Sequence, residues 1–290
     1  MTEPTPAGQT PAHPTPAHPT SATTPMGASP SDLPRPLVGT VSLVTGANKG
    51  IGFEVARALG EQGSTVLAGA RDPERGAEAE HRLRALGLDA HHLPLDVTDA
   101  DSIARAAKVV ADEHGRLDIL VNNAAITGGW DVGPPSHTPV DVLRHVYETN
   151  VFGVVALTNA LLPLLRQAPA GRIVNVSSEV GSIEAMSDPD GVLAELVSIP
   201  YPSSKTALNM VTAMYAKELR GTPLKVNAAN PGYCATDLNG HRGFRTPEQG
   251  AEAIVALATL PEDGPSGLLY GHLWRSDAQP GDPEYGRLPW

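Results

Sequence analysis

The stretch "TGANKGIG", from Thr45 to Gly52, decides the fold. It follows the apolar run "TVSLV" and precedes "FEVARALGEQG", so three glycines and a lysine stand where a buried strand turns into a helix. Such a loop can bind a pyrophosphate, because its free backbone N–H groups and the helix dipole both point at the ligand. Gly46, Gly50 and Gly52 keep side chains out of that approach. The G-x-x-x-G-x-G spacing alone also fits an ordinary glycine-rich turn.

Short apolar runs alternate with longer helical patterns on both sides of this loop. This alternation is typical of a parallel sheet that is covered by helices on both faces. The strands of such a sheet are apolar on both sides, because neither face meets water. The sequence therefore predicts an α/β fold, a single Rossmann-type doubly wound parallel sheet with helices on both faces, over residues 37–290. The expected strands are 41–46, 65–71, 90–97, 117–125, 171–178, 224–232 and, more weakly, 266–271; the expected helices are 53–63, 74–87, 101–115, 140–165 and 205–221.

Residues 1–36 differ from the rest in composition. They contain near-repeats such as "TPAHP" with almost no large apolar side chain, which predicts a disordered tail. A metal-binding role for His13 and His18 is an alternative, although no cysteine or acidic partner is near them. The histidines show no paired metal-ligand spacing, so no metal is expected.

Composition limits the possible partners and the location. The 290 residues are 41% hydrophobic with a net charge of −11, so we expect no nucleic acid or anionic membrane partner. One cysteine, Cys234, fits a reducing compartment, and no apolar run approaches the roughly 20 residues of a membrane span. A cytoplasmic protein with a small-molecule ligand is expected.

Six further segments follow the glycine loop in a recognisable order. The chain resembles the short-chain dehydrogenase/reductase family in "TGANKGIG", "LDV" at 95–97, "NNAA" at 122–125, Asn150, "NVSS" at 175–178, "YPSSK" at 201–205 and "NPGYCAT" at 230–236. Within that family, the first motif with its flanks, the arginine after the second strand and the terminal Trp290 look most like carbonyl reductases that use NADPH.

The second strand indicates which dinucleotide binds. An NAD site usually ends this strand with a carboxylate for the adenosine ribose, but Ala70 stands there and Arg71 follows. Arg71 can pair with a 2′-phosphate and Lys49 can add a second charge, which predicts NADP(H). Alternatively both are solvated surface charges, and Asp72 could be mistaken for the ribose carboxylate. With what the resemblance implies, the predicted cofactor-binding residues are Gly46, Asn48, Lys49, Gly50, Ile51, Gly52, Arg71, Asp96, Val97, Asn123, Ala124, Pro231, Gly232 and Thr236.

The predicted chemistry centres on Tyr201 and Lys205. A lysine four residues after a tyrosine lies one helical turn along, where its charge would favour the phenolate and lower the phenol pKa. The spacing alone is common. The resemblance makes Tyr201 the general acid, lets Lys205 bind the nicotinamide ribose, selects Ser178 over Ser177 as donor to the substrate oxygen, and gives Asn150 a water linked to the lysine.

These residues predict NADPH-dependent reduction of an aldehyde or ketone to an alcohol. The alternatives are an NADP-dependent alcohol dehydrogenase working mainly in oxidation, and an NADP-binding sensor without turnover. Expected substrate-lining residues are Trp130 with the loop around it, the insertion before Tyr201, and 237–245, which resembles the family's mobile lid. The 4% aromatic content gives no hint of a stacking pocket. The insertion makes a monomer credible by resemblance, and the choice between monomer and homo-oligomer stays open.

Overall fold

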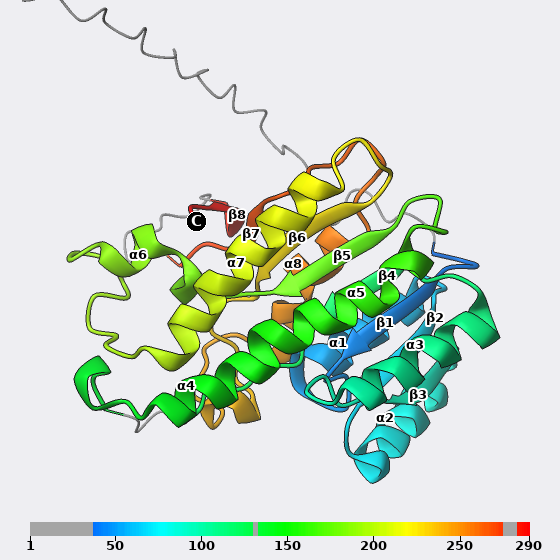
Figure 1. The fold of residues 1–290 in the computed structure, drawn as a ribbon, viewed down its shortest axis with the longest axis horizontal. Coiled ribbons are helices and arrows are strands. Elements are labelled where there is room, and N and C mark those ends of the chain that lie inside the picture. The colour runs from blue at the N-terminus through cyan, green and yellow to red at the C-terminus, as the bar shows by residue number, and fades with distance from the viewer. Residues whose placement is uncertain (1–36, 130–132, 275–282) are drawn as a thin grey trace, which may run out of the picture.

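One mixed sheet organises the part of the chain that is described in the computed structural model, namely residues 37–129, 133–274 and 283–290. Its strand order is β3-β2-β1-β4-β5-β6-β7-β8 (Figure 1). The strands are β1 (Val41–Thr45), β2 (Thr65–Ala70), β3 (Ala90–Pro94), β4 (Ile119–Asn122), β5 (Arg172–Val176), β6 (Lys225–Asn230), β7 (Leu269–His272) and β8 (Tyr285–Leu288). The predicted tail, residues 1–36, lies outside the described residues.

The central strands of the sheet are buried on both faces. Every residue of β1, β4 and β5 is buried, as expected for strands that have helices on both faces. The strands from β1 to β7 pair in parallel, which confirms the predicted doubly wound fold. The sheet differs from the prediction at one edge, where β8 pairs antiparallel with β7. The sequence reading omitted this four-residue strand because "YGRL" shows no alternation of apolar and polar residues.

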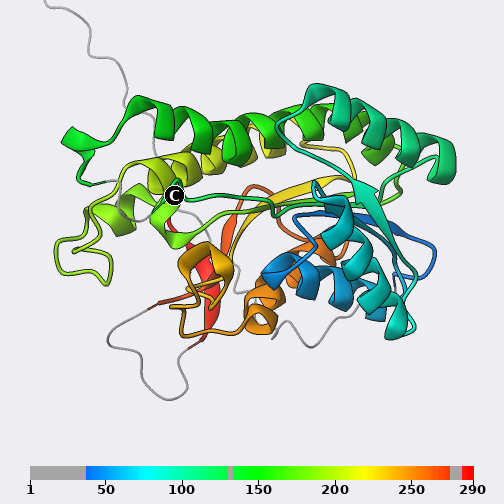
Figure 2. The same cartoon turned by 90° about the horizontal axis from the view of Figure 1, so that it is seen from below.

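Helices cover both faces of the sheet (Figure 2). One apolar core joins α1, α2 and α8 to the sheet, and a second joins α3, α5 and the end of α7 to the other face. The helices are α1 (Gly50–Glu61), α2 (Pro73–Ala85), α3 (Ala100–His114), α4 (Val140–Tyr147), α5 (Gly153–Leu165), α6 (Ile183–Ser187), α7 (Pro200–Glu218) and α8 (Pro247–Ala258). Helix α8 was not predicted from the sequence.

The predicted helix over 140–165 is continuous but contains a π-helical turn, Glu148–Phe152, between α4 and α5. By length and composition this 26-residue segment would suit a membrane span, which corrects the expectation that no run approaches that length. Half of its most apolar window is buried in the protein. Leu157, Leu161 and Leu165 are completely buried against the sheet, as in the core helix of a soluble domain.

The strand order reverses between β1 and β4, and this reversal positions the site. From β1 the chain first adds strands on one side, β2 and β3, and then on the other side, from β4 to β8. The connections at the carboxyl ends of β1 and β4 therefore leave in opposite directions and open a crevice between them. The glycine loop lies at this crevice.

Candidate active site

The glycine loop has a conformation that requires its glycines. Gly46 and Gly50 have φ angles of +64° and +56°, in the left-handed region that other residues rarely adopt. A Cβ atom on Gly52 would lie 2.4 Å from Nδ2 of Asn123 and 2.5 Å from the carbonyl oxygen of Gly46. Asn123 holds the loop in place, because its Nδ2 donates a hydrogen bond to the carbonyl oxygen of Thr45 at 2.8 Å. The loop therefore presents backbone instead of side chains to the crevice.

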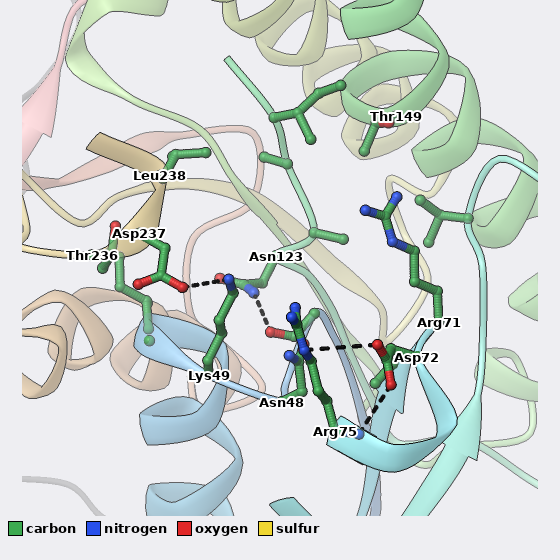
Figure 3. A pocket seen from close by; sticks show the side chains of 18 of the residues that line it. Asn48, Lys49, Arg71, Asp72, Arg75, Asn123, Thr149, Thr236, Asp237 and Leu238 are labelled. Carbon is green, nitrogen blue, oxygen red and sulfur yellow. Dashed lines mark hydrogen bonds and ion pairs between the residues drawn. The ribbon is translucent and has the colours of Figure 1, made fainter. Parts of the chain in front are cut away.

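A cavity of about 610 Å³ opens beside this loop at the carboxyl ends of the strands (Figure 3). Its walls come from the glycine loop, the ends of β2 and β4, the segment after β3, and the loop after β6. The predicted cofactor-binding residues that line it are Gly46, Asn48, Lys49, Gly50, Ile51, Arg71, Asp96, Val97, Asn123, Ala124 and Thr236. Of the described residues predicted for the cofactor, Gly52, Pro231 and Gly232 do not line it. Gly52 lies beneath the loop, and the other two follow β6.

Charged side chains gather at the end of the cavity near β2 (Figure 3). Arg71 lines the cavity directly after Ala70, as predicted. Asp72 caps α2, since its carboxylate accepts hydrogen bonds from the backbone N–H groups of Glu74 and Arg75, both at 3.1 Å. These two hydrogen bonds give Asp72 a structural role as the N-cap of α2. Arg75 also lines the cavity, and its Nε lies 3.7 Å from the Asp72 carboxylate.

Arg75, which lies in the first turn of α2, was not predicted from the sequence. The partner of Lys49 was not predicted either. The Lys49 ammonium forms an ion pair of 2.5 Å with Asp237, the residue after Thr236 (Figure 3). Lys49 therefore lies at the cavity as predicted, but it is paired with a carboxylate from the loop after β6.

Asp96 also lines the cavity. Partial burial would raise the pKa of its carboxyl, but hydrogen bonds from the side chain and backbone of Thr98 outweigh burial and hold the pKa below its usual range. Arg71 contributes in the same direction. Asp96 is therefore an anion at neutral pH, available as a hydrogen-bond acceptor.

Tyr201, Ser178 and Lys205 meet beyond this cavity. Tyr201 lies in the first turn of α7, which begins at Pro200, and its phenol is within hydrogen-bonding reach of the Ser178 hydroxyl. The Lys205 ammonium lies 5.4 Å from the centroid of the Tyr201 ring and donates to the carbonyl oxygen of Val176 at 2.7 Å. Ser177 instead donates to Oδ1 of Asn209 at 2.6 Å and is buried. The structure thus brings the predicted tyrosine, serine and lysine together.

Burial dominates the electrostatics of this group. It raises the pKa of the Tyr201 phenol, and the hydrogen bond with Ser178 offsets the increase only in part. Burial also lowers the pKa of Lys205 to about 7. The phenol pKa therefore shifts opposite to the expected lowering, because burial is the largest cause. The phenol holds its proton at neutral pH.

Asn150 lies in the π-helical turn and is almost completely buried. Its side chain accepts a hydrogen bond from the backbone N–H of Ile126 at 2.9 Å and donates to the carbonyl oxygen of Ile126 at 2.9 Å. It also donates to the hydroxyl of Ser204 on α7 at 3.0 Å. Because Ile126 lines the cavity, Asn150 connects the cavity to the first turn of α7. Its predicted role in holding a water stays a prediction.

The loop after β6 lies over the glycine loop. A Cβ atom on Gly50 would be 3.5 Å from the Thr236 side chain. Gly232 has a φ angle of +76°, and its N–H donates to Oδ1 of Asn230 at 3.2 Å. Cys234 is buried in this loop, and burial raises the pKa of its thiol to about 11. A protonated thiol is a poor nucleophile, so the geometry indicates no nucleophilic role for Cys234.

Two other expectations concern this region. Trp130, predicted to line the substrate site, lies outside the described residues. Within residues 37–129, 133–274 and 283–290, no cluster of three or more metal-ligating side chains is present.

Comparisons with known proteins agree with this geometry. A family model described as "short chain dehydrogenase" matches residues 40–244, which include every predicted site residue. The (+)-neomenthol dehydrogenase of Capsicum annuum is 33% identical over 296 residues, which cover 79% of this chain and 94% of that protein. Carbonyl reductase [NADPH] 1 of Sus scrofa is 36% identical over 267 residues, covering 78% and 90%. An NADPH-bound carbonyl reductase from chicken fatty liver superposes with a TM-score of 0.71 at 30% identity, covering 81% and 96%.

Proposed function

Since the chain belongs to the short chain dehydrogenase family, and is therefore an oxidoreductase, we propose that it reduces an aldehyde or ketone to the alcohol with NADPH as the reductant. The observation that carries this proposal is the contact of Tyr201 with Ser178 and Lys205 beside a cavity that suits a dinucleotide. Relatives named as NADPH carbonyl reductases support the same reaction.

NADP(H) is the cofactor, and the residues of the cavity fit it. The glycine loop leaves its backbone exposed where a pyrophosphate would bind at the N-terminus of α1. Arg71 and Arg75 supply positive charge near the end of β2, where Ala70 offers no carboxylate to an unphosphorylated ribose. When bound, NADPH supplies the hydride that goes to the carbonyl carbon.

Tyr201 would donate its phenolic proton to the carbonyl oxygen as that oxygen becomes negative. Ser178 would donate a hydrogen bond to the same oxygen and so stabilise the developing charge. The Tyr201 phenolate left behind recovers a proton from water. Asn150 holds α7 and the segment after β4 in register, which makes it a positioning residue for the phenol.

The raised pKa of Tyr201 keeps the phenol protonated near neutral pH, which is the form that reduction uses. Oxidation of an alcohol uses the phenolate as base, which forms at higher pH. The ratio of NADPH to NADP⁺ sets the net direction, so an alcohol dehydrogenase working mainly in oxidation is the alternative, and assays in both directions distinguish the two.

The test follows the loss of NADPH absorbance with a panel of aldehydes and ketones. We expect turnover by the wild type and a loss of about 10²- to 10⁴-fold in Tyr201→Phe, with NADPH binding retained. Tyr215→Phe is the matched control, because Tyr215 lies on the same helix but its hydroxyl donates to Asn159, away from Ser178. Tight NADPH binding without turnover on any carbonyl would instead favour the sensor hypothesis.

We also propose a cytoplasmic location, supported by the single cysteine and its buried thiol, which fit a reducing compartment. Cell fractionation with an antibody to the full chain tests it, and recovery in a secreted or membrane fraction would refute it.

A further inference from the structure

Glu179 is a buried carboxyl group that the reaction described above does not use. It follows Ser178 directly and begins a short 3-10 turn, Glu179–Gly181, yet it is only 7% exposed. Its backbone N–H donates to Oδ1 of Asn230 at 3.2 Å. Among the described residues, no cationic side chain pairs with its carboxylate. A buried carboxylate without a cation is costly, so a cationic ligand placed beside it would be favoured.

The Glu179 carboxyl is close to the reacting groups. Its charge contributes to raising the pKa of Tyr201 on α7 and of Cys234 in the loop after β6. Burial raises the pKa of Glu179 to about 7, and the Asn230 amide offsets the increase in part. The carboxyl is therefore divided between its neutral and ionised forms near neutral pH, and a cation placed next to it would favour the ionised form.

The cations nearest to this group are already engaged. Lys205 donates to the carbonyl oxygen of Val176. Arg245, which is close to Cys234, binds Glu284, Tyr285 and the carbonyl oxygen of Gln249. Burial lowers the pKa of His272, so its ring is neutral at neutral pH. None of these three side chains therefore neutralises the Glu179 carboxylate.

Aromatic rings gather on the same side of the site, although the chain contains few of them. Phe244 lies at the centre, with its ring centroid 6.1 Å from Tyr233, 6.0 Å from His272 and 5.4 Å from Trp274. Phe244 and Trp274 are 57% and 38% exposed, so their faces are open to a ligand. The low aromatic content gave no hint of this cluster, because its residues lie far apart in the sequence.

One buried amide connects the turn at Glu179 to the segments that carry the aromatic rings. The Asn230 side chain accepts from the backbone N–H groups of Glu179 and Gly232 and donates to the carbonyl oxygen of His272 at 2.8 Å. These contacts hold the backbone at Glu179, the loop that carries Tyr233 and the strand that precedes Trp274 in one arrangement. An anionic group beside exposed aromatic faces is the combination that recognises organic ammonium ions.

We propose that the substrate is a carbonyl compound bearing an ammonium group, which pairs with the Glu179 carboxylate and packs against the rings of Tyr233, Phe244 and Trp274. This inference rests on the proposed carbonyl reduction and adds the class of substrate to it. Glu179 is then a specificity-determining residue, while Tyr201 and Ser178 act on the carbonyl oxygen.

The test uses pairs of ketones that differ only in charge. The meta and para isomers of acetylphenyl-trimethylammonium are compared with the corresponding tert-butyl acetophenones, which have nearly the same shape. For the better isomer, we expect the wild type to prefer the ammonium ketone by about tenfold in kcat/KM. Because the ammonium charge is permanent and Glu179 ionises with rising pH, this preference should grow as the pH rises through about 7.

Glu179→Gln should reduce the preference ratio about tenfold and abolish its pH dependence. Glu184→Gln is the matched control, since Glu184 lies five residues further on the exposed start of α6 and should keep the ratio of the wild type. Phe244→Leu should also lower the ratio by removing one aromatic face. Binding of phenyltrimethylammonium, measured by calorimetry on the NADP⁺ complex, gives the same comparison without turnover.

Different failures separate the two proposals. Reduction of the tert-butyl ketones with no preference for the ammonium ketones, at any pH and by any variant, would overturn the role of Glu179 while leaving carbonyl reduction intact. Absence of turnover on all ketones would refute the proposed function, and the calorimetric comparison of wild type with Glu179→Gln would still decide the cation site. If Glu179→Gln does not fold, Phe244→Leu decides, because an unchanged ratio in that variant would overturn the packing of the ammonium group against the rings.

Discussion

At the level of a single residue, the buried ammonium group of Lys205 lowers the free energy of unfolding. Burial lowers the pKa of its ammonium group to about 7, from an ordinary value near 10.5. Between these values the unfolded chain binds more protons than the folded chain, so the free energy of unfolding rises with pH in that window. The full cost of the buried charge is present below about pH 7. The site thus keeps a lysine that the fold alone would disfavour.

Lys205→Met should therefore stabilise the cofactor-free protein while it abolishes reduction. We expect a gain of roughly 1–4 kcal/mol at about pH 6 that shrinks towards about pH 10, because the deprotonated lysine carries no charge to desolvate. Urea unfolding at several pH values measures it. Lys217→Met, on the same helix but exposed, is the control and should change little. A gain that is equal at all pH values would contradict the assignment of the cost to the buried charge.

Arg71 and Arg75 should decide between the two nicotinamide dinucleotides. Loss of a charge-assisted hydrogen bond to a 2′-phosphate costs about 10- to 100-fold in affinity, so Arg71→Ala should raise the Kd for NADPH by that factor and leave NADH nearly unchanged. We expect a smaller effect from Arg75→Ala. Arg84→Ala, near the far end of α2, where the guanidinium pairs with Glu80, should change neither affinity. An equal loss for both dinucleotides would show that these arginines do not read the phosphate.

At the level of elements, the junction of β1 and α1 depends on a backbone contact that one methyl group would break. Gly52→Ala would place Cβ against Nδ2 of Asn123 and the carbonyl oxygen of Gly46. We expect a loss of about 1–3 kcal/mol in the free energy of unfolding together with weaker binding of NADPH. Gly87→Ala has open space but a φ angle of +81°, so it measures the backbone cost alone and should leave NADPH affinity unchanged. Unaltered NADPH affinity in Gly52→Ala would argue against this loop as the pyrophosphate site.

Elements whose signals are local could be predicted from the sequence, and α1 and α7 are examples. The glycines, the apolar run before them and the Tyr201–Lys205 spacing each act within a few residues, so the strand and the loop were predicted, and the two helices were predicted with starts three and five residues after the observed ones. By contrast, Asp237 and the cluster around Phe244 gain their meaning only when segments distant in the sequence meet. The missed helix α8 had a local signal that was not used, namely Thr246, Pro247 and Gln249 at its start.

This start signal of α8 supports a prediction. The Thr246 hydroxyl accepts from the backbone N–H of Gln249 at 3.2 Å, and the Gln249 side chain accepts from the Thr246 N–H at 2.9 Å. Thr246→Ala should lower the free energy of unfolding by about 1 kcal/mol, and Thr246→Ser should restore most of it. Thermal or urea unfolding measures both. Equal stability of the alanine and serine variants would show that the cap contributes nothing here.

At the level of the whole molecule, the sheet places two functions on one edge. The nucleotide cavity lies over β1 to β4, and the groups around Tyr201 and Glu179 lie over β5 to β7, because the carboxyl ends of all seven parallel strands face the same way. Asn150 and Asn230 connect segments of this edge that are distant in the sequence. Asn150 donates a hydrogen bond to Ser204 on α7, and Asn230 accepts one from the backbone N–H of Glu179. The C-terminal strands β7 and β8 lie beyond the matched family region, and they bring Trp274 and the partners of Arg245 to this edge. Variation among relatives in this region would therefore change the substrate more readily than the cofactor.

The composition of residues 1–36 predicts that the domain does not need them. Leu37 is almost completely buried, and its backbone N–H donates to the carbonyl oxygen of Gln62 at 3.0 Å, so the described chain is already packed into the core at this residue. A chain that starts at Arg35 should unfold in one cooperative transition, at the midpoint of the full chain, with the same kcat and KM for NADPH. Removal of Leu37 and Val38 as well is the informative comparison: it should lower the midpoint, because it deletes the Leu37 side chain from the core. A lower midpoint or an altered KM in the chain that starts at Arg35 would mean that the Pro/Thr/Ala-rich segment interacts with the domain.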